Sequence, residues 1–181
     1  MCCIQAIGTS MPDLILVDAS DRQVGACGAL ECHSGEGILH RAFTIFVYNS
    51  RGDVLIQRRS VVKRLWPSTW ETSCSGHPLQ GEDIAAAAKK RLREELGIAA
   101  VLEDVGKFTY HARYGDEGSE NEVCHLLVAS YDGPVMPDPA EVSEYSWLDV
   151  AALRDDISQH SEVYAPWVVP ALDVLEAGRR R

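Results

Sequence analysis

The chain has 181 residues, of which 46% are hydrophobic and 24% charged, and its formal net charge is −10. This balance is typical of a globular protein that can bury a sizeable core, so we expect one domain over residues 1–181. The acidic charge argues against a broad surface for nucleic acid or anionic membranes, but it allows a small basic pocket. The sequence has no apolar run of membrane length and no start typical of secretion, so we expect a cytoplasmic protein. We also expect a monomer or a homodimer.

Strands are predicted in the first part of the chain. Asp13–Val17 and the segment HRAFTIFVYN (residues 40–49) are rich in β-branched and aromatic side chains. The polar turn Asn49–Asp53 connects the second strand to a returning strand, VLIQRR (54–59). Two motifs without clear periodicity, WPSTWETS and GHPLQGE, follow this strand.

The second part of the chain predicts helices between and after further strands. Asp83–Leu96 is rich in helix formers, and Gly97 follows it, as is common at helix C-termini. Asp149 is suited to cap a helix, and an amphipathic helix that Pro170 starts or kinks is expected from about residue 161. Strands flanking a central helix predict a mixed α/β sandwich. The remaining strands are predicted at Val101–Tyr110, at Glu120–Ser130 after the polar turn YGDEGS, and at EYSWLD.

The segment GHPLQGEDIAAAAKKRLREELGI (76–98) carries the first chemical signal. It predicts a loop leading into a helix whose carboxylates hold a hard divalent cation, which in turn binds diphosphate. The segment resembles a Nudix box, except that Lys90 and Arg91 stand where the box has Arg-Glu. The stretch KKRLREEL by itself is equally typical of an exposed charged helix. The positions that resemble the box are Gly76, Glu82, Leu92, Glu94, Glu95, Gly97 and Ile98.

Three histidines and two glutamates form the second candidate cluster. His33 and His40 are seven residues apart, and His77 follows in the GHP motif. Glu120 and Glu122 lie two apart on a predicted strand, so both carboxylates face the same side. Such a set suits a five- or six-coordinate divalent ion better than a closed tetrahedral zinc site, although each residue alone is more often structural or exposed. The six cysteines form no CxxC pair, and we expect reduced thiols.

The ordered blocks HRAF, WPSTWETSxSGHP, ELG, SENEV and APW, with their spacing, resemble the type 1 isopentenyl-diphosphate isomerases along nearly the whole chain. The resemblance implies a Nudix-type mixed β-sheet sandwich flanked by helices, with extra N- and C-terminal elements. It also implies a reaction that moves a double bond between isopentenyl and dimethylallyl diphosphate, a small-molecule prenyl diphosphate substrate. The implied metal ligands are His33, His40, His77, Glu120 and Glu122 for one Mn²⁺ or Mg²⁺, and Glu95 for a second Mg²⁺ that bridges to diphosphate. The implied basic contacts to diphosphate are Arg59, Lys63 and Arg91.

The implied reaction pocket needs an acid on one face of the alkene and a base on the other. Protonation creates a tertiary carbocation, which an aromatic face stabilises. By resemblance Trp167 is that aromatic side chain, with Tyr110 and Glu122 around the proton donor; Trp167 is otherwise a plausible core anchor. A carbocation also needs water kept out, which suits a lid such as the N-terminal segment.

The chain departs from the family at two positions of this pocket. Ser75 stands where the family has its catalytic cysteine, and an alcohol is a much weaker acid than a thiol. Cys74 is adjacent, but neighbouring side chains of a strand face opposite sides, so Cys74 replaces Ser75 only if the strand is bulged. Ala29 stands where the family usually has a lysine that touches diphosphate, which weakens or reshapes binding unless another cation such as Arg22 reaches in.

Three functions follow from this pattern. The leading one is isomerisation of isopentenyl diphosphate or a related, alkyl-modified prenyl diphosphate. The second is Nudix hydrolysis of a diphosphate, which the Glu94–Glu95 pair favours and the broken Arg-Glu pair disfavours. The third is a catalytically weakened diphosphate-binding homologue, against which stands the full set of metal ligands.

Overall fold

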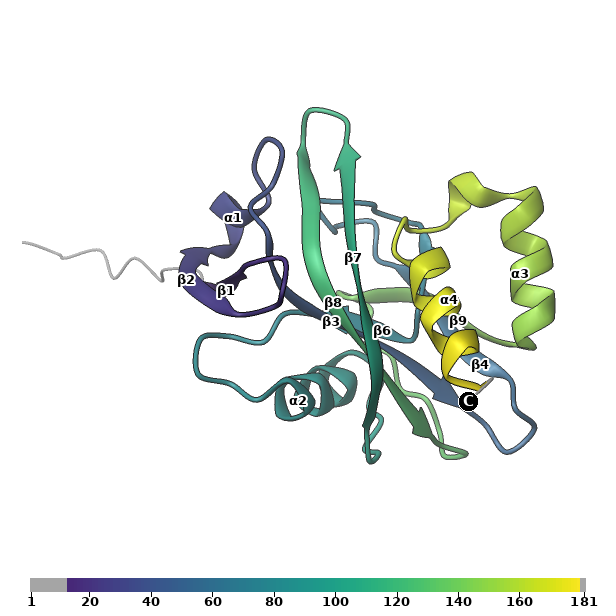
Figure 1. Ribbon diagram of the computed structural model, residues 1–181. Coiled ribbons are helices and arrows are strands. Elements are labelled where there is room, and N and C mark those ends of the chain that lie inside the picture. The colour runs from purple at the N-terminus through teal and green to yellow at the C-terminus, as the bar shows by residue number, and fades with distance from the viewer. Residues whose placement is uncertain (1–12, 180–181) are drawn as a thin grey trace, which may run out of the picture.

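The computed structural model describes residues 13–179, which form one mixed sheet with helices on both faces (Figure 1). The strands are β1 (Asp13–Val17), β2 (Gln23–Gly28), β3 (His40–Tyr48), β4 (Val54–Arg59), β5 (Trp70–Glu71), β6 (Cys74–Gly76), β7 (Glu103–Tyr114), β8 (Gly118–Ser130) and β9 (Val142–Leu148). The helices are α1 (Ala29–Cys32), α2 (Ile84–Leu96), α3 (Val150–Gln159) and α4 (Val168–Arg179), with one 3₁₀ turn, η1 (Ser161–Val163). None of these helices is long and apolar enough to cross a membrane.

Strand β3 lies at the centre of the sheet. It runs parallel to β8, from His40 opposite Glu122 onward, and antiparallel to the short strand β6. Its side chains alternate between the two faces, as the period of a strand requires. Ile45 therefore packs in the core beneath α2, whereas Phe46 packs in the core beneath α3 and α4.

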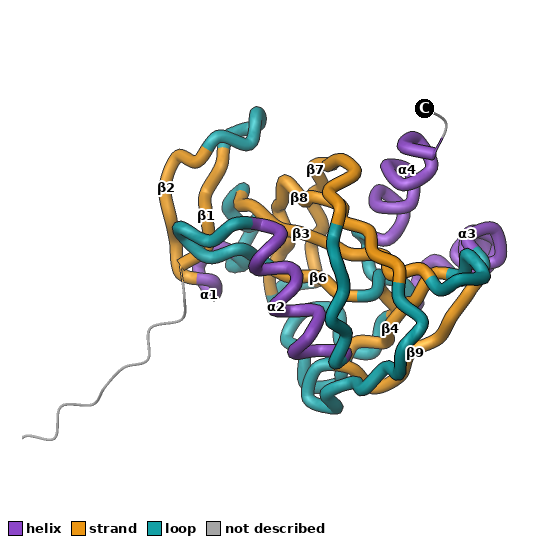
Figure 2. Tube along the Cα trace, turned by 90° about the horizontal axis from the view of Figure 1, so that it is seen from below, coloured by secondary structure: helices purple, strands orange, loops and turns teal. Residues whose placement is uncertain are grey.

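The helices cover these two cores on opposite faces of the sheet (Figures 1 and 2). Helix α2 is capped at its N-terminus by Asp83, whose side chain accepts a hydrogen bond from the Ala86 N–H at 2.9 Å. It ends at Gly97, whose φ of 68° favours glycine because a Cβ is strained there. The hairpin of β1 and β2 lies at the start of the described chain, and the helix α4 lies at its end (Figure 1).

The predicted mixed α/β sandwich is confirmed, with the expected elements shifted at their ends. Asp149 caps α3 as predicted, and its carboxylate accepts from the Ala151 N–H at 2.9 Å. The bounds predicted for the strand at Val101–Tyr110 are wrong, because β7 runs over Glu103–Tyr114. Its C-terminal end lies beyond the prediction because the hairpin with β8 stays paired up to Tyr114. Pro170 lies in the first turn of α4, where its missing N–H breaks no helical hydrogen bond. The prediction missed β2, α1, β5 and β6, most of which are very short.

Candidate active site

Five side chains converge where β3 and β8 lie side by side. His33 follows α1, His40 begins β3, His77 follows β6, and Glu120 and Glu122 lie on β8. One potential ligand atom from each lies within 4.8 Å of all the others. The parallel register opposes His40 to Glu122, and the period of β8 brings Glu120 to the same face.

The hydrogen bonds of two histidines prepare them to bind a metal. Nδ1 of His33 lies 2.6 Å from the carbonyl oxygen of Ala29, and Nδ1 of His40 lies 2.7 Å from that of Ile38. A carbonyl only accepts, so each Nδ1 carries a proton and each Nε2 faces the cluster, where that of His33 lies 2.9 Å from Glu120 Oε2. Nε2 of His40 is buried and has no hydrogen-bond partner. Three imidazole nitrogens and two carboxylates therefore fit a divalent cation.

The electrostatics of the cluster also favour a cation. Burial, together with the neighbouring Glu122 carboxylate, raises the pKa of Glu120. Burial alone would also raise the pKa of Glu122, but the rings of His40 and His77 hold it well below its usual value. Burial lowers the pKa of His77 to about 4, so its ring is neutral at pH 7. A neutral ring beside two crowded carboxylates is the state that a metal ion needs.

A cavity of about 480 Å³ opens beside this cluster. Tyr110 lies in its wall, and the Tyr110 hydroxyl donates a hydrogen bond to Glu122 Oε2 at 2.8 Å. Burial raises the pKa of Tyr110 well above its usual value, so the hydroxyl keeps its proton. The buried Trp167 forms another part of the wall, and Ala29 lines the cavity where a longer side chain would narrow it.

The register of β6 on β3 separates Ser75 from Cys74. Thr44 pairs with Ser75 and Ile45 pairs with Cys74, without a bulge. Ser75 lines the cavity, and its hydroxyl lies 3.0 Å from that of Thr44. Cys74 is fully buried in the core beneath α2, where burial raises its pKa well above the usual value. The backbone therefore gives Cys74 no access to the cavity.

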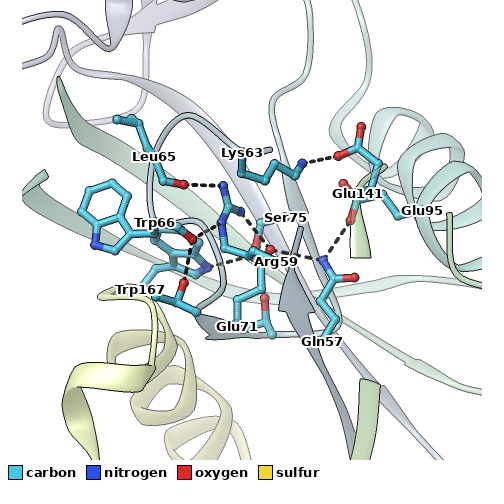
Figure 3. A network of polar contacts seen from close by, with 12 residues as sticks. Gln57, Arg59, Lys63, Leu65, Trp66, Glu71, Ser75, Glu95, Glu141 and Trp167 are labelled. Carbon is cyan, nitrogen blue, oxygen red and sulfur yellow. Dashed lines mark hydrogen bonds and ion pairs between the residues drawn. The ribbon is translucent and has the colours of Figure 1, made fainter. Parts of the chain in front are cut away.

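The three predicted diphosphate contacts line the cavity, and each already has an acidic partner. Figure 3 shows two of them, Arg59 and Lys63. Arg59 Nη1 lies 2.9 Å from Glu71 Oε1. Lys63 pairs with Glu141. Arg91 Nη2 lies 2.7 Å from a Glu95 oxygen and 2.8 Å from a Glu141 oxygen. The carboxylates of Glu71, Glu95 and Glu141 therefore hold the three cations in place.

Two predicted residues lie differently from the expectation. Glu95 is buried and tied to Arg91 and Gln57, and it is not among the residues that line the cavity, whereas Glu94 is. Arg22 pairs with Asp18 and its side chain is 79% exposed, so it does not replace the lysine absent at position 29. The N-terminal segment proposed as a lid falls largely within residues 1–12, which lie outside the described residues.

Sequence reasoning missed several residues around the cavity. Lys90 lines it beside Arg91, and their spacing from Ala87 and Glu94 is that of one helical face. That periodicity was a readable signal in the sequence. Glu71 carried no such signal, because its partners Arg59 and Trp167 are 12 and 96 residues away.

Comparisons with known proteins agree with this geometry. The NUDIX domain family matches residues 38–168. The isopentenyl-diphosphate Delta-isomerase of Nocardia farcinica is 42% identical over 91% of this chain and 95% of its own length, and that of Serratia proteamaculans is 38% identical over 91% of each.

Solved structures share the fold. DR0079 from Deinococcus radiodurans superimposes with a TM-score of 0.72 at 23% identity, covering 93% of this chain and 98% of its own. The MutT protein from Methanosarcina mazei Go1 gives a TM-score of 0.62 at 20% identity, covering 81% and 97%. The chain therefore belongs to the Nudix superfamily and, within it, to the isopentenyl-diphosphate Delta-isomerases.

Proposed function

We propose that this chain moves the double bond of isopentenyl diphosphate, or of a related prenyl diphosphate with an added alkyl group, by protonation and deprotonation. The observation that carries the proposal is that one cavity borders the five-residue ligand cluster, a tyrosine–glutamate pair, an aromatic face and a group of cations. The names of the relatives support the isomerase over a hydrolase.

The metal would be held by His33, His40, His77, Glu120 and Glu122, and we propose Mg²⁺ or Mn²⁺. When bound, the ion would supply positive charge that offsets the two crowded carboxylates, one of which, Glu122, already accepts the hydrogen bond of Tyr110. We propose Glu95 as the residue that would hold the second Mg²⁺, which would require Arg91 to give up its contact with the Glu95 carboxylate.

Proton transfer is assigned to the two sides of the cavity. Tyr110 and Glu122 are proposed to lie around the proton donor at the terminal carbon of the alkene, and the face of Trp167 is proposed to stabilise the tertiary cation. The proton lost from the methylene carbon next to the cationic carbon, on the diphosphate side, leaves on the side of Ser75. Because an alcohol is not a base near neutral pH, Ser75 acts only as a relay: its oxygen takes this proton while its own hydroxyl proton passes to a phosphate oxygen or to water. No role in proton transfer is assigned to Cys74.

The diphosphate is proposed to bind Arg59, Lys63 and Arg91, with Lys90 as a further cation on the same wall. Ala29 leaves room where the family has a lysine. We therefore propose that the chain handles ordinary isopentenyl diphosphate poorly and a bulkier substrate better. A cytoplasmic location and a monomeric or homodimeric state stay predictions.

Incubation with isopentenyl diphosphate and Mg²⁺ in D₂O tests the function. The expected result is dimethylallyl diphosphate with deuterium in its new methyl group, detected by NMR and mass spectrometry. Phosphate release without isomerised product would identify a hydrolase instead. Tight binding without any turnover, for this substrate and its alkylated homologues, would identify a non-catalytic binding protein.

A further inference from the structure

Glu71 is a buried carboxylate that contacts two residues of the cavity wall, Arg59 and Trp167, without lining the cavity itself. The residue is only 1% exposed. Its Oε1 accepts hydrogen bonds from Arg59 Nη1 at 2.9 Å and from Gln57 Nε2 at 3.2 Å. Its Oε2 accepts one from the indole Nε1 of Trp167 at 3.2 Å (Figure 3). One anion thus holds a proposed diphosphate ligand and the proposed carbocation-stabilising ring.

Arg59 creates an electrostatic problem for that ring. Its guanidinium carbon lies 5.3 Å from the centroid of Trp167. Backbone carbonyls fix it there, because Nε donates to Trp66 and Nη2 donates to Leu65, both at 3.0 Å. A fixed positive charge beside the ring face opposes the development of a second positive charge on the substrate, most strongly where little water is present.

The Glu71 carboxylate solves this problem in two ways. It balances the charge of Arg59 at a direct hydrogen-bonded contact. It also accepts the indole N–H, which pushes electron density onto the ring and strengthens its attraction for a cation.

We propose that Glu71 is a positioning residue for the isomerase reaction: it fixes Arg59 and Trp167 relative to each other and supplies the counter-charge that lets a carbocation form beside a diphosphate-binding arginine. The inference rests on the proposed function, specifically on the roles of Arg59 and Trp167. Glu71 acts through these two side chains and does not touch the substrate.

The test compares two diphosphates of similar shape with the metal-loaded protein. One carries a protonated dimethylamino group where the cationic carbon forms, and the other carries the neutral saturated isopentyl group. Calorimetry gives the affinity of each, and their ratio reports attraction for the positive charge independently of diphosphate binding. We expect Glu71→Gln to lower this ratio by about tenfold or more, because a neutral amide leaves the charge of Arg59 unbalanced.

Two further variants separate this role from a structural one. Arg59→Gln should weaken binding of both ligands yet raise the ratio by roughly tenfold, because Glu71 then attracts the cation unopposed. Circular dichroism shows whether Glu71→Gln folds. If it does not fold, the Arg59→Gln variant still tests the inference. Glu141→Gln removes a carboxylate that contacts Lys63 and Arg91 but not Trp167, so the ratio should stay within about threefold of the parent value.

The outcomes distinguish the inference from the function on which it rests. An unchanged ratio in folded Glu71→Gln, or no rise in Arg59→Gln, overturns the role of Glu71 while leaving the isomerase intact. A parent chain that binds the neutral ligand as tightly as the cationic one overturns the proposed carbocation site itself, and the role of Glu71 with it.

Discussion

Ser75 and Cys74 are consecutive residues of β6, and the register with β3 sends them to opposite faces of the sheet. The proposed reaction therefore has an alcohol in the cavity and a thiol locked in the core. The Ser75 hydroxyl lies 3.0 Å from that of Thr44 and 3.1 Å from that of Thr72. None of these three alcohols is a base at neutral pH, so we predict that proton removal on this side limits the reaction with ordinary isopentenyl diphosphate.

Ser75→Cys should therefore raise isomerisation of isopentenyl diphosphate, by about tenfold or more in kcat/KM, because a thiol can be tuned to a pKa near the working pH. Product formation under steady-state conditions measures the change. As a matched control, Cys74→Ser should keep the parental rate, since its side chain faces the core. A folded Cys74→Ser protein that loses all activity, beside a Ser75→Cys protein that gains none, would show that the thiol acts after all.

His40 offers the most direct test of the metal centre. Its Nε2 is buried without a hydrogen-bond partner and its Nδ1 is already used by Ile38. His40→Ala should therefore lose the tightly held metal, measured as metal content per chain after dialysis, together with activity. His111→Ala is the control, because His111 is half exposed and contacts Glu36 rather than the cluster. Equal metal content in the two variants would remove His40 from the ligand set.

At the scale of elements, Asp21 ties the β1–β2 hairpin to the sheet. It adopts a φ of 63° in the turn between these strands. Its carboxylate contacts Arg41 at 2.7 Å, Lys107 at 2.9 Å and His125 at 2.8 Å, on β3, β7 and β8 respectively. Burial alone would raise the pKa of Asp21, but these three partners lower it to about 2. The hairpin precedes α1 and His33, so this anchor also positions one wall of the metal centre.

Asp21→Asn should destabilise the fold by about 2 kcal/mol near neutral pH, since each pKa unit is worth about 1.4 kcal/mol. The sign follows from the lowered pKa: the stabilisation is present above the unfolded value of 3.8 and is lost as the pH falls toward 2. Urea unfolding of parent and variant between about pH 7 and pH 3 measures this difference. A difference that grows as the pH falls would contradict the assignment.

The sequence predicted elements best where their signals were long. The helix at Asp83–Leu96 was placed within one residue, because its cap, its helix formers and Gly97 agree. The two-residue β5 and the three-residue β6 are too short for any period to show, yet they carry Glu71 and Ser75. The family resemblance named the five residues that the fold brings within 4.8 Å of one another, whereas the contact of Glu71 with Trp167 depends on packing that no local pattern encodes.

At the scale of the whole molecule, the proposed metal joins segments that are far apart in the chain. Its ligands come from the end of α1, the start of β3, the loop after β6, and β8. Without a cation, two buried carboxylates crowd each other there. A ligand that binds only the folded state at a hundred times its Kd stabilises it by about 2.7 kcal/mol.

Removal of the metal with a chelator should accordingly lower the unfolding temperature by several degrees, the shift that a loss of about 2.7 kcal/mol of folding free energy produces. Readdition of Mn²⁺ or Mg²⁺ should restore it, as measured by calorimetry. The His40→Ala protein should show no response to either treatment. Identical unfolding temperatures for the chelated and metal-loaded parent chain would mean that the cluster does not bind metal tightly.

Because Ser75 and not Cys74 faces the cavity, the register of β6 also determines how the active site reacts with electrophiles and oxidants. The alcohol of Ser75 does not react with alkylating agents or peroxide under conditions that modify thiolates. The described cysteine that lines the cavity, Cys124, is buried, and burial raises its pKa, as it does for Cys74. Both remain protonated and unreactive at neutral pH. Iodoacetamide or peroxide should leave turnover intact, whereas the Ser75→Cys protein should be inactivated and protected by bound substrate. We therefore expect the parent chain to turn over isopentenyl diphosphate more slowly than the Ser75→Cys protein and to resist oxidants better.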